Sequence, residues 1–281
     1  MSAILYLEHL SDADLALLAA VADAGSPARL LRSLHASPDS LGVLLGDPAL
    51  FATLFRGEAG NALLRASPFL AFAVLIHRAT RDLAERRFVE EWIGPNRRVP
   101  MFEVADLRDF LAAPLHRLFL AELLASYTRV ASGSVWIHTP RGWRRRRYSE
   151  LDPLRLIDLL ATLPEGERPA LYRRLGDLAL FLTGVFPDHA GRHVLAPLQQ
   201  ARLRRALDWN GGEESGGITL LEDIGRLAYR SAWQATVGAG NTGSLLHDMA
   251  QGFAQARRVL NFATDRYLFP RREEWFPLLE N

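Results

Sequence analysis

The sequence predicts an all-α fold: a multi-helix globular domain of about nine or ten helices around a buried central helix, with one β-hairpin insertion. Helical spacing of apolar residues and helix-start signals recur along most of the chain. One segment, Gly176–Phe186, is apolar at nearly every position, and a helix without a polar face is buried on all sides. A β-branched and aromatic pattern replaces the helical one around residues 134–148.

The first part of the chain, residues 1–60, has the pattern of a few short helices. Ser11 and the acidic residues after it are typical of a helix start, and they predict a helix over residues 11–24. A capping residue followed by proline, another start signal, recurs at Ser26-Pro27, Asp47-Pro48 and Ser67-Pro68. We therefore expect an N-terminal short-helix subdomain over residues 1–66 and a main helical domain over residues 67–281.

Longer helices are expected in the main domain. A helix over residues 68–92 is apolar in its first half and charged in its second half. A helical stretch over residues 104–130 contains Pro114, which should kink it or split it in two. Beyond the hairpin, helical patterns cover residues 153–163, 188–208, 218–237 and 244–269.

The composition excludes several classes of chemistry. Among 281 residues, 49% are hydrophobic, which is the share expected of a globular protein. Cysteine is absent, so disulfides, thiolate metal sites and a cysteine nucleophile are excluded. Lysine is also absent, and all 33 basic residues are arginine, which excludes Schiff-base and P-loop lysine chemistry. The net charge of +1 is not that of a chain that binds polyanions over its whole surface.

The sequence gives no membrane or secretion signal that we recognise. Its N-terminal residues lack a basic start followed by an apolar run, so no signal peptide is expected. The central apolar segment is shorter than the roughly 20 residues that a bilayer span requires. We expect a cytoplasmic protein without a membrane-bound part, and we expect no cofactor.

Asp177 is a carboxylate inside the most apolar helix. A buried charge must be paired, hydrogen-bonded or protonated, and Arg173 and Arg174 precede Asp177 by one helical turn. The structural interpretation is an ion pair that fixes how the central helix docks. Loss of Asp177 would then leave a buried arginine unpaired, at a cost on the order of 3–5 kcal/mol.

The functional interpretation of the same carboxylate is catalysis or ligand binding in a cleft. Asp177 and Glu122 are the candidate catalytic residues, with His116 or Tyr172 as neighbours in that cleft. Sequence alone does not establish that these side chains lie near one another.

Two short motifs, a histidine pair and a glycine-rich segment, are only weak indications of a zinc site and a dinucleotide site. His189 and His193 are four residues apart, as zinc-binding histidines on a helix are, but Ala190 stands where the specific motif has glutamate. The expectation is therefore no metal site. The residues from Gly238 to Gly243 match G-x-G-x-x-G, but a helical pattern precedes them, so a helix–loop–helix connection is expected instead of a dinucleotide site.

The predicted hairpin is the candidate binding surface. Arginine side chains bind phosphates, and exposed aromatic rings stack on bases. Along the second strand, alternate arginines lie on opposite faces, so at least one pair meets solvent or an acidic partner. Alternatively, the tryptophans cover the core and the arginines pair within the chain. The candidate binding residues are Trp136, Arg141, Trp143, Arg144, Arg145, Arg146, Arg147 and Tyr148.

Two functions follow as hypotheses. The first is a non-enzymatic helical interaction or regulatory protein that presents the hairpin to an acidic protein surface or to nucleic acid. The second is a small-ligand-binding protein or enzyme with a pocket near Asp177. The sequence leaves homo-oligomerisation open.

Overall fold

A computed structural model provides the structure of this chain, which divides into two compact units. The first unit comprises Met1–Val89, Met101–Thr128 and Phe262–Trp275, and the second comprises Glu90–Pro100, Arg129–Asn261 and Phe276–Asn281. The residues that the structure describes are 2–56, 65–94, 97–128, 132–139, 142–149, 151–160, 163–192, 201, 207, 217–236, 241–269, 275 and 276. A further boundary at residue 66, inside the first unit, stays a prediction.

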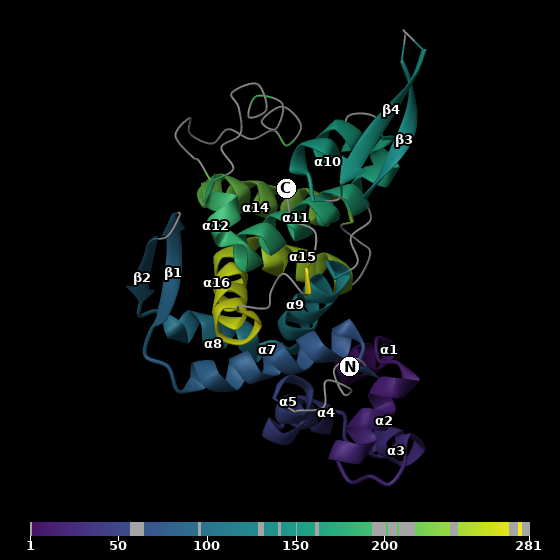
Figure 1. The fold of residues 1–281 in the computed structure, drawn as a ribbon, viewed down its shortest axis with the longest axis vertical. Coiled ribbons are helices and arrows are strands. Elements are labelled where there is room, and N and C mark those ends of the chain that lie inside the picture. The colour runs from purple at the N-terminus through teal and green to yellow at the C-terminus, as the bar shows by residue number, and fades with distance from the viewer. Residues whose placement is uncertain are drawn as a thin grey trace. The chain divides into compact units, whose positions relative to one another are not determined.

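Helices dominate both units (Figure 1), which confirms the all-α class. The first unit contains α1 (Ser2–Glu8), α2 (Asp12–Val21), α3 (Pro27–Ala36), α4 (Ser40–Leu45), α5 (Pro48–Phe55), α7 (Pro68–Ala84), α8 (Val104–Ala112), α9 (Pro114–Ser126) and a π-helical turn, Thr264–Leu268. The second unit contains α10 (Pro153–Leu160), a 3-10 turn (Glu165–Glu167), α11 (Arg168–Val185), α12 (Pro187–Arg192), α14 (Gly217–Ala235), α15 (Asn241–Gln251) and most of α16 (Phe253–Ala263). The strands are β1 (Val89–Gly94), β2 (Arg97–Met101), β3 (Ser132–Thr139) and β4 (Gly142–Ser149).

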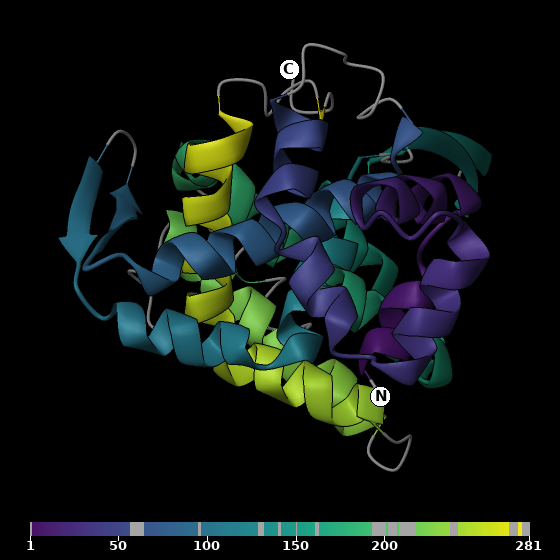
Figure 2. The ribbon, with the colours of Figure 1, turned by 90° about the horizontal axis from the view of Figure 1, so that it is seen from below.

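Helix α7 organises the core of the first unit. It contacts α4, α5, α8 and α9 (Figure 2), and every residue from Phe69 to His77 is buried. The buried carboxylate of Asp14 joins α2 to the start of α7, because its Oδ1 accepts a hydrogen bond from the backbone N–H of Ser67 at 2.7 Å. Burial of this apolar helix face is the main source of stability for such a unit.

Helix α11 is the central helix of the second unit. All residues from Leu175 to Val185 are buried, which confirms the prediction made for Gly176–Phe186. Helices α10, α12 and α14 contact α11. Gly176 allows a close approach, because a Cβ atom there would lie 2.6 Å from the ring of Tyr229 on α14. Among the helices of the described ranges, none is long and apolar enough to cross a membrane.

The predicted helix starts are confirmed. Ser11 accepts a hydrogen bond from the backbone N–H of Asp14 in a reciprocal capping box at the start of α2. At each of the three cap–proline pairs, the capping side chain accepts a backbone hydrogen bond and proline occupies the first turn of the helix. The caps are Ser26, Asp47 and Ser67.

The structure also confirms the hairpin and the effect of Pro114, which separates α8 from α9. The expectation of one helix over residues 68–92 is wrong. Helix α7 ends at Ala84, and Val89–Gly94 forms β1, paired with β2 in a second two-stranded sheet. The charged residues around Val89, Trp92 and Ile93 favour a helix. Val89, Trp92 and Ile93 themselves favour a strand, and their pairing across to β2 outweighs the helical preference of their neighbours.

Candidate functional site

The hairpin strands β3 and β4 pair antiparallel in a register that brings aromatic and arginine positions together. Trp136 lies opposite Arg145, and His138 lies opposite Trp143. Directly opposed positions share one face of an antiparallel pair, as do positions two residues apart. Arg147 therefore belongs to the same face. We call these five positions the tryptophan face.

The other face of the ribbon has aliphatic positions. Val135 lies opposite Arg146, Ile137 lies opposite Arg144, and Tyr148 belongs to the same face. Each face therefore carries two of the four consecutive arginines. The structure describes the backbone of these strands, and of the candidate binding residues only Arg141 lies outside the described residues.

Asp177 lies buried between α11 and α14, with 9% of its surface exposed. Its Oδ1 accepts a hydrogen bond from the hydroxyl of Tyr229 at 2.9 Å. Its Oδ2 lies 3.9 Å from Nε of Arg173, whose side chain is 42% exposed. The carboxylate thus has a partner on the neighbouring helix in addition to the arginine that the helical spacing predicts.

The other residues of the hypothetical cleft have their own partners. In the first unit, Glu122 Oε1 lies 2.8 Å from Nε2 of His9, and His116 Nδ1 donates to the carbonyl oxygen of Phe110 at 2.7 Å. Tyr172, like Asp177, belongs to the second unit. A shared cleft of these residues stays a prediction.

The histidine pair is only partly described. The backbone of His189 lies in α12, whereas His193 lies outside the described residues. Among the side chains that the structure describes, no group of three or more histidine, aspartate or glutamate residues is arranged to hold a metal ion.

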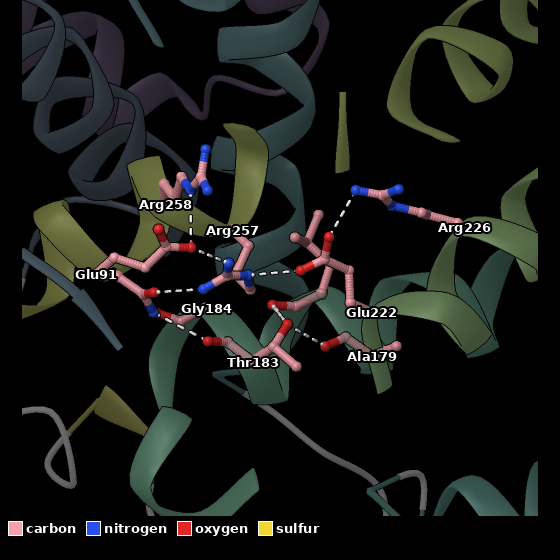
Figure 3. Close-up of polar contacts among 10 residues, drawn as sticks. Glu91, Ala179, Thr183, Gly184, Glu222, Arg226, Arg257 and Arg258 are labelled. Atoms are coloured by element: carbon pink, nitrogen blue, oxygen red, sulfur yellow. Dashed lines mark hydrogen bonds and ion pairs between the residues drawn. The ribbon is translucent and has the colours of Figure 1, made fainter. Parts of the chain in front are cut away.

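A buried ionic network in the second unit was not predicted (Figure 3). Arg257 of α16, which is 5% exposed, donates to Glu91 of β1 at 2.6 Å and to Glu222 of α14 at 2.9 Å. Arg258 donates to Glu91 at 2.9 Å, and Arg226 donates to Glu222 at 2.6 Å. Five alternating charges thus join a strand and two helices of this unit.

Neutral polar groups extend the network to the central helix (Figure 3). Arg257 lies 3.5 Å from the side-chain oxygen of Asn261. The side-chain amide of Asn261 donates to the carbonyl oxygens of Thr183 at 2.9 Å and Gly184 at 2.7 Å. The carbonyl oxygens near the end of α11 therefore receive side-chain donors in place of solvent.

The arginines of the network change the acidity of Glu91. Burial alone would raise the pKa of the Glu91 carboxyl, but hydrogen bonds from Arg258 and Arg257, with their charges, lower the pKa below its ordinary value. Glu91 therefore stays ionised at neutral pH. An ionised, fully paired carboxylate stabilises this arrangement and has no proton available for acid catalysis at that pH.

In the first unit, Asp82 is the centre of a smaller cluster of ion pairs and hydrogen bonds. Its Oδ2 accepts hydrogen bonds from Tyr267 at 2.9 Å and Arg266 at 2.8 Å, and its Oδ1 pairs with Arg78 at 3.0 Å. Burial would raise the pKa of Asp82, and these donors together lower it. The cluster joins α7 to the π-helical turn near the C-terminal end of the chain.

One sequence signal could have indicated the buried network. In α16, Phe253, Ala256 and Leu260 are buried at helical spacing, and Arg257 falls on the same stripe. A charged residue on an apolar stripe predicts a buried partner. The identity of that partner is not readable from local spacing, since Glu91 is 166 residues away.

Comparison of the chain with protein-family models, curated proteins and solved structures finds no match. What the chain does is therefore inferred from its own residues.

Proposed function

We propose that this chain is a non-enzymatic helical interaction protein that binds an anionic partner through the β3–β4 hairpin. The observation that carries the proposal is the strand register, which divides Arg144–Arg147 equally between the two faces. Whichever face packs against the protein, the other offers two guanidinium groups. Guanidinium groups bind carboxylates and phosphates through paired hydrogen bonds.

The other ribbon of the chain supports the proposal by contrast. In β1–β2, Arg98 lies over the ring of Trp92 at 4.0 Å and donates to Glu90 at 3.0 Å. That ribbon therefore supplies a carboxylate for its own Arg98. Between Ser132 and Ser149 the sequence has five arginines and no aspartate or glutamate. An anion for the β3–β4 ribbon must come from outside the ribbon.

The alternative function, a pocket near Asp177, has less support. The hydroxyl of Tyr229 occupies one oxygen of the Asp177 carboxylate, and Arg173 lies beside the other. Both contacts favour a role in helix docking over a role in ligand binding.

A binding assay with two simple polyanions tests the proposed function. The full chain would be titrated into a fluorescent mixed-sequence oligonucleotide and into fluorescent poly-glutamate at low salt. The wild-type chain should bind at least one of them. The charge-reversed variant R144E/R145E/R146E/R147E should lose that binding, because a favourable local field becomes repulsive.

A matched control has the same change in net charge elsewhere. The variant R29E/R32E/R87E/R97E reverses four arginines at exposed positions outside the hairpin. It should keep the affinity of the wild-type chain within a few-fold. Equal affinity of the hairpin variant and the wild-type chain, or no binding of either polyanion by the wild-type chain, contradicts the proposal.

A further inference from the structure

We propose, on the basis of the proposed function, that the anionic partner is a single-stranded nucleic acid bound along the tryptophan face of the hairpin. Two indole positions, Trp136 and Trp143, lie on this face with two arginine positions, Arg145 and Arg147. Bases stack on aromatic rings, and guanidinium groups bind phosphates. The register therefore combines both kinds of group that a single strand requires.

Aromatic and arginine positions lie next to one another on this face of the ribbon. On β4, positions 143, 145 and 147 of this face are occupied by tryptophan, arginine and arginine, and Trp136 of β3 lies opposite the middle one. Same-face neighbours in a strand are about 6.8 Å apart, since each residue rises about 3.4 Å. A single strand can spread its bases to this spacing, whereas the stacked bases of a duplex are not available to an indole.

The aromatic content of this face distinguishes nucleic acid from an acidic protein. A carboxylate is bound by guanidinium groups alone, whereas a base can also stack on an aromatic ring at the indole positions and at position 138 of this face. Every nucleobase has a π-face that can stack on such rings, whatever its sequence. The opposite face, with Val135 and Ile137, has the aliphatic positions suited to packing against protein.

The first test compares three polyanionic ligands, of which the single strand and poly-glutamate carry equal numbers of charges. The full chain would be titrated with a mixed-sequence single-stranded DNA, with the same sequence as a duplex, and with poly-glutamate, all at one low salt concentration. The single strand should bind at least about tenfold more tightly than the other two. Equal or weaker binding of the single strand, with poly-glutamate or duplex bound, overturns this inference and leaves the proposed function standing. Binding of none of the three overturns both.

The second test uses the register itself. The variant R145Q/R147Q removes both arginines of the tryptophan face, and R144Q/R146Q removes the same number from the other face at the same net charge. Single-strand affinity should fall about tenfold or more in the first variant and less than threefold in the second. An equal loss in both variants, or a larger loss in R144Q/R146Q, overturns the assignment to this face.

A tryptophan variant separates stacking from charge. W136L/W143L should weaken single-strand binding about tenfold or more and leave binding of poly-glutamate unchanged, while W136F/W143F should keep much of the affinity. Thermal unfolding would show that each variant is folded. If W136L/W143L binds the single strand as the wild-type chain does, stacking on these indoles is refuted.

Discussion

The hydroxyl of Tyr229 donates a hydrogen bond to the carboxylate of Asp177 at 2.9 Å. The side chain of Tyr229 has no exposed surface, and its ring lies against Gly176, one residue before Asp177. The polar and the close-packed contacts between α11 and α14 therefore meet at one place. Such a pair fixes how one helix is positioned on the other, because a shifted arrangement would bury both groups without partners.

Replacement of Asp177 by alanine should destabilise the protein by about 1–3 kcal/mol, because the Tyr229 hydroxyl would lose a buried acceptor. The sequence alone predicts a loss of about 3–5 kcal/mol. The smaller value is expected because the side chain of Arg173 is 42% exposed, so water can solvate it when its ion pair with Asp177 is lost. Urea unfolding of Asp177→Ala and Asp177→Asn measures the effect. Asparagine keeps an acceptor and should recover part of the loss. Equal stability of Asp177→Ala and the wild-type chain would contradict this role.

Glycine at position 176 should be required for helix packing. Alanine in a helix interior is intrinsically favoured over glycine by about 1 kcal/mol, but a Cβ atom here would lie 2.6 Å from the Tyr229 ring. Overpacking of a core costs about 1–3 kcal/mol, so we expect Gly176→Ala to lower the melting temperature. Gly166→Ala is the control, because a Cβ atom there meets nothing within 4 Å. A melting temperature of Gly176→Ala at or above that of the wild-type chain would show that the helices separate without cost.

Arg257 should be among the most important charged residues for stability. Its replacement by alanine leaves Glu91 and Glu222 without their shared buried partner. We expect a loss of about 3 kcal/mol, the lower end for a broken buried pair, because Arg258 and Arg226 still donate to these carboxylates.

Chemical unfolding of Arg257→Ala and Arg230→Ala would test this. Arg230 is an exposed arginine on α14, and its loss should change stability by less than about 0.5 kcal/mol. Similar small effects of both substitutions would mean that the ionic network contributes no net stability.

The stability of the chain should depend on pH through His77. Burial and the charge of Arg117 lower the pKa of His77 from its ordinary value of 6.5 to about 3, although a hydrogen bond with the backbone of Gly42 acts in the opposite direction. Between these values the unfolded chain binds the proton more readily, so stability is greatest above pH 6.5 and falls as the pH falls. The loss from pH 7 to pH 5 should be about 2 kcal/mol.

Unfolding of His77→Gln at the same two pH values measures this contribution. The variant should lose about 2 kcal/mol less than the wild-type chain over the interval. His35→Gln, at an exposed position, should behave like the wild-type chain. An identical pH dependence of His77→Gln and the wild-type chain would show that folding does not lower the pKa of His77.

Local signals in the sequence were sufficient for much of the fold. A capping residue and its proline act within one helical turn, so Ser26, Asp47 and Ser67 could be recognised as helix starts. The hairpin strands are marked by composition and by the turn between them. The strand β1 could not be predicted in this way, because its pairing with β2 outweighs the helical preference of the charged residues around it.

The polar contacts of the core depend on long-range neighbours. Helical spacing predicts Arg173 as a partner of Asp177, but Tyr229 is 52 residues away and no local pattern indicates it. The same holds for Glu91 and Arg257. The faces on which the hairpin residues lie, in contrast, follow from local rules. Residues alternate between the two faces of a strand, and the length of the turn limits how the two strands can pair.

The salt dependence of single-strand binding tests the central claim most directly. Each phosphate contact on a single strand contributes a slope of about −0.7 in log K against log salt concentration, so Arg145 and Arg147 together predict a slope of about −1.4. Titrations of the wild-type chain from about 50 to 200 mM salt should give that slope, which corresponds to about a sevenfold loss of affinity over this range. Binding whose affinity does not change with salt would contradict phosphate recognition by the hairpin.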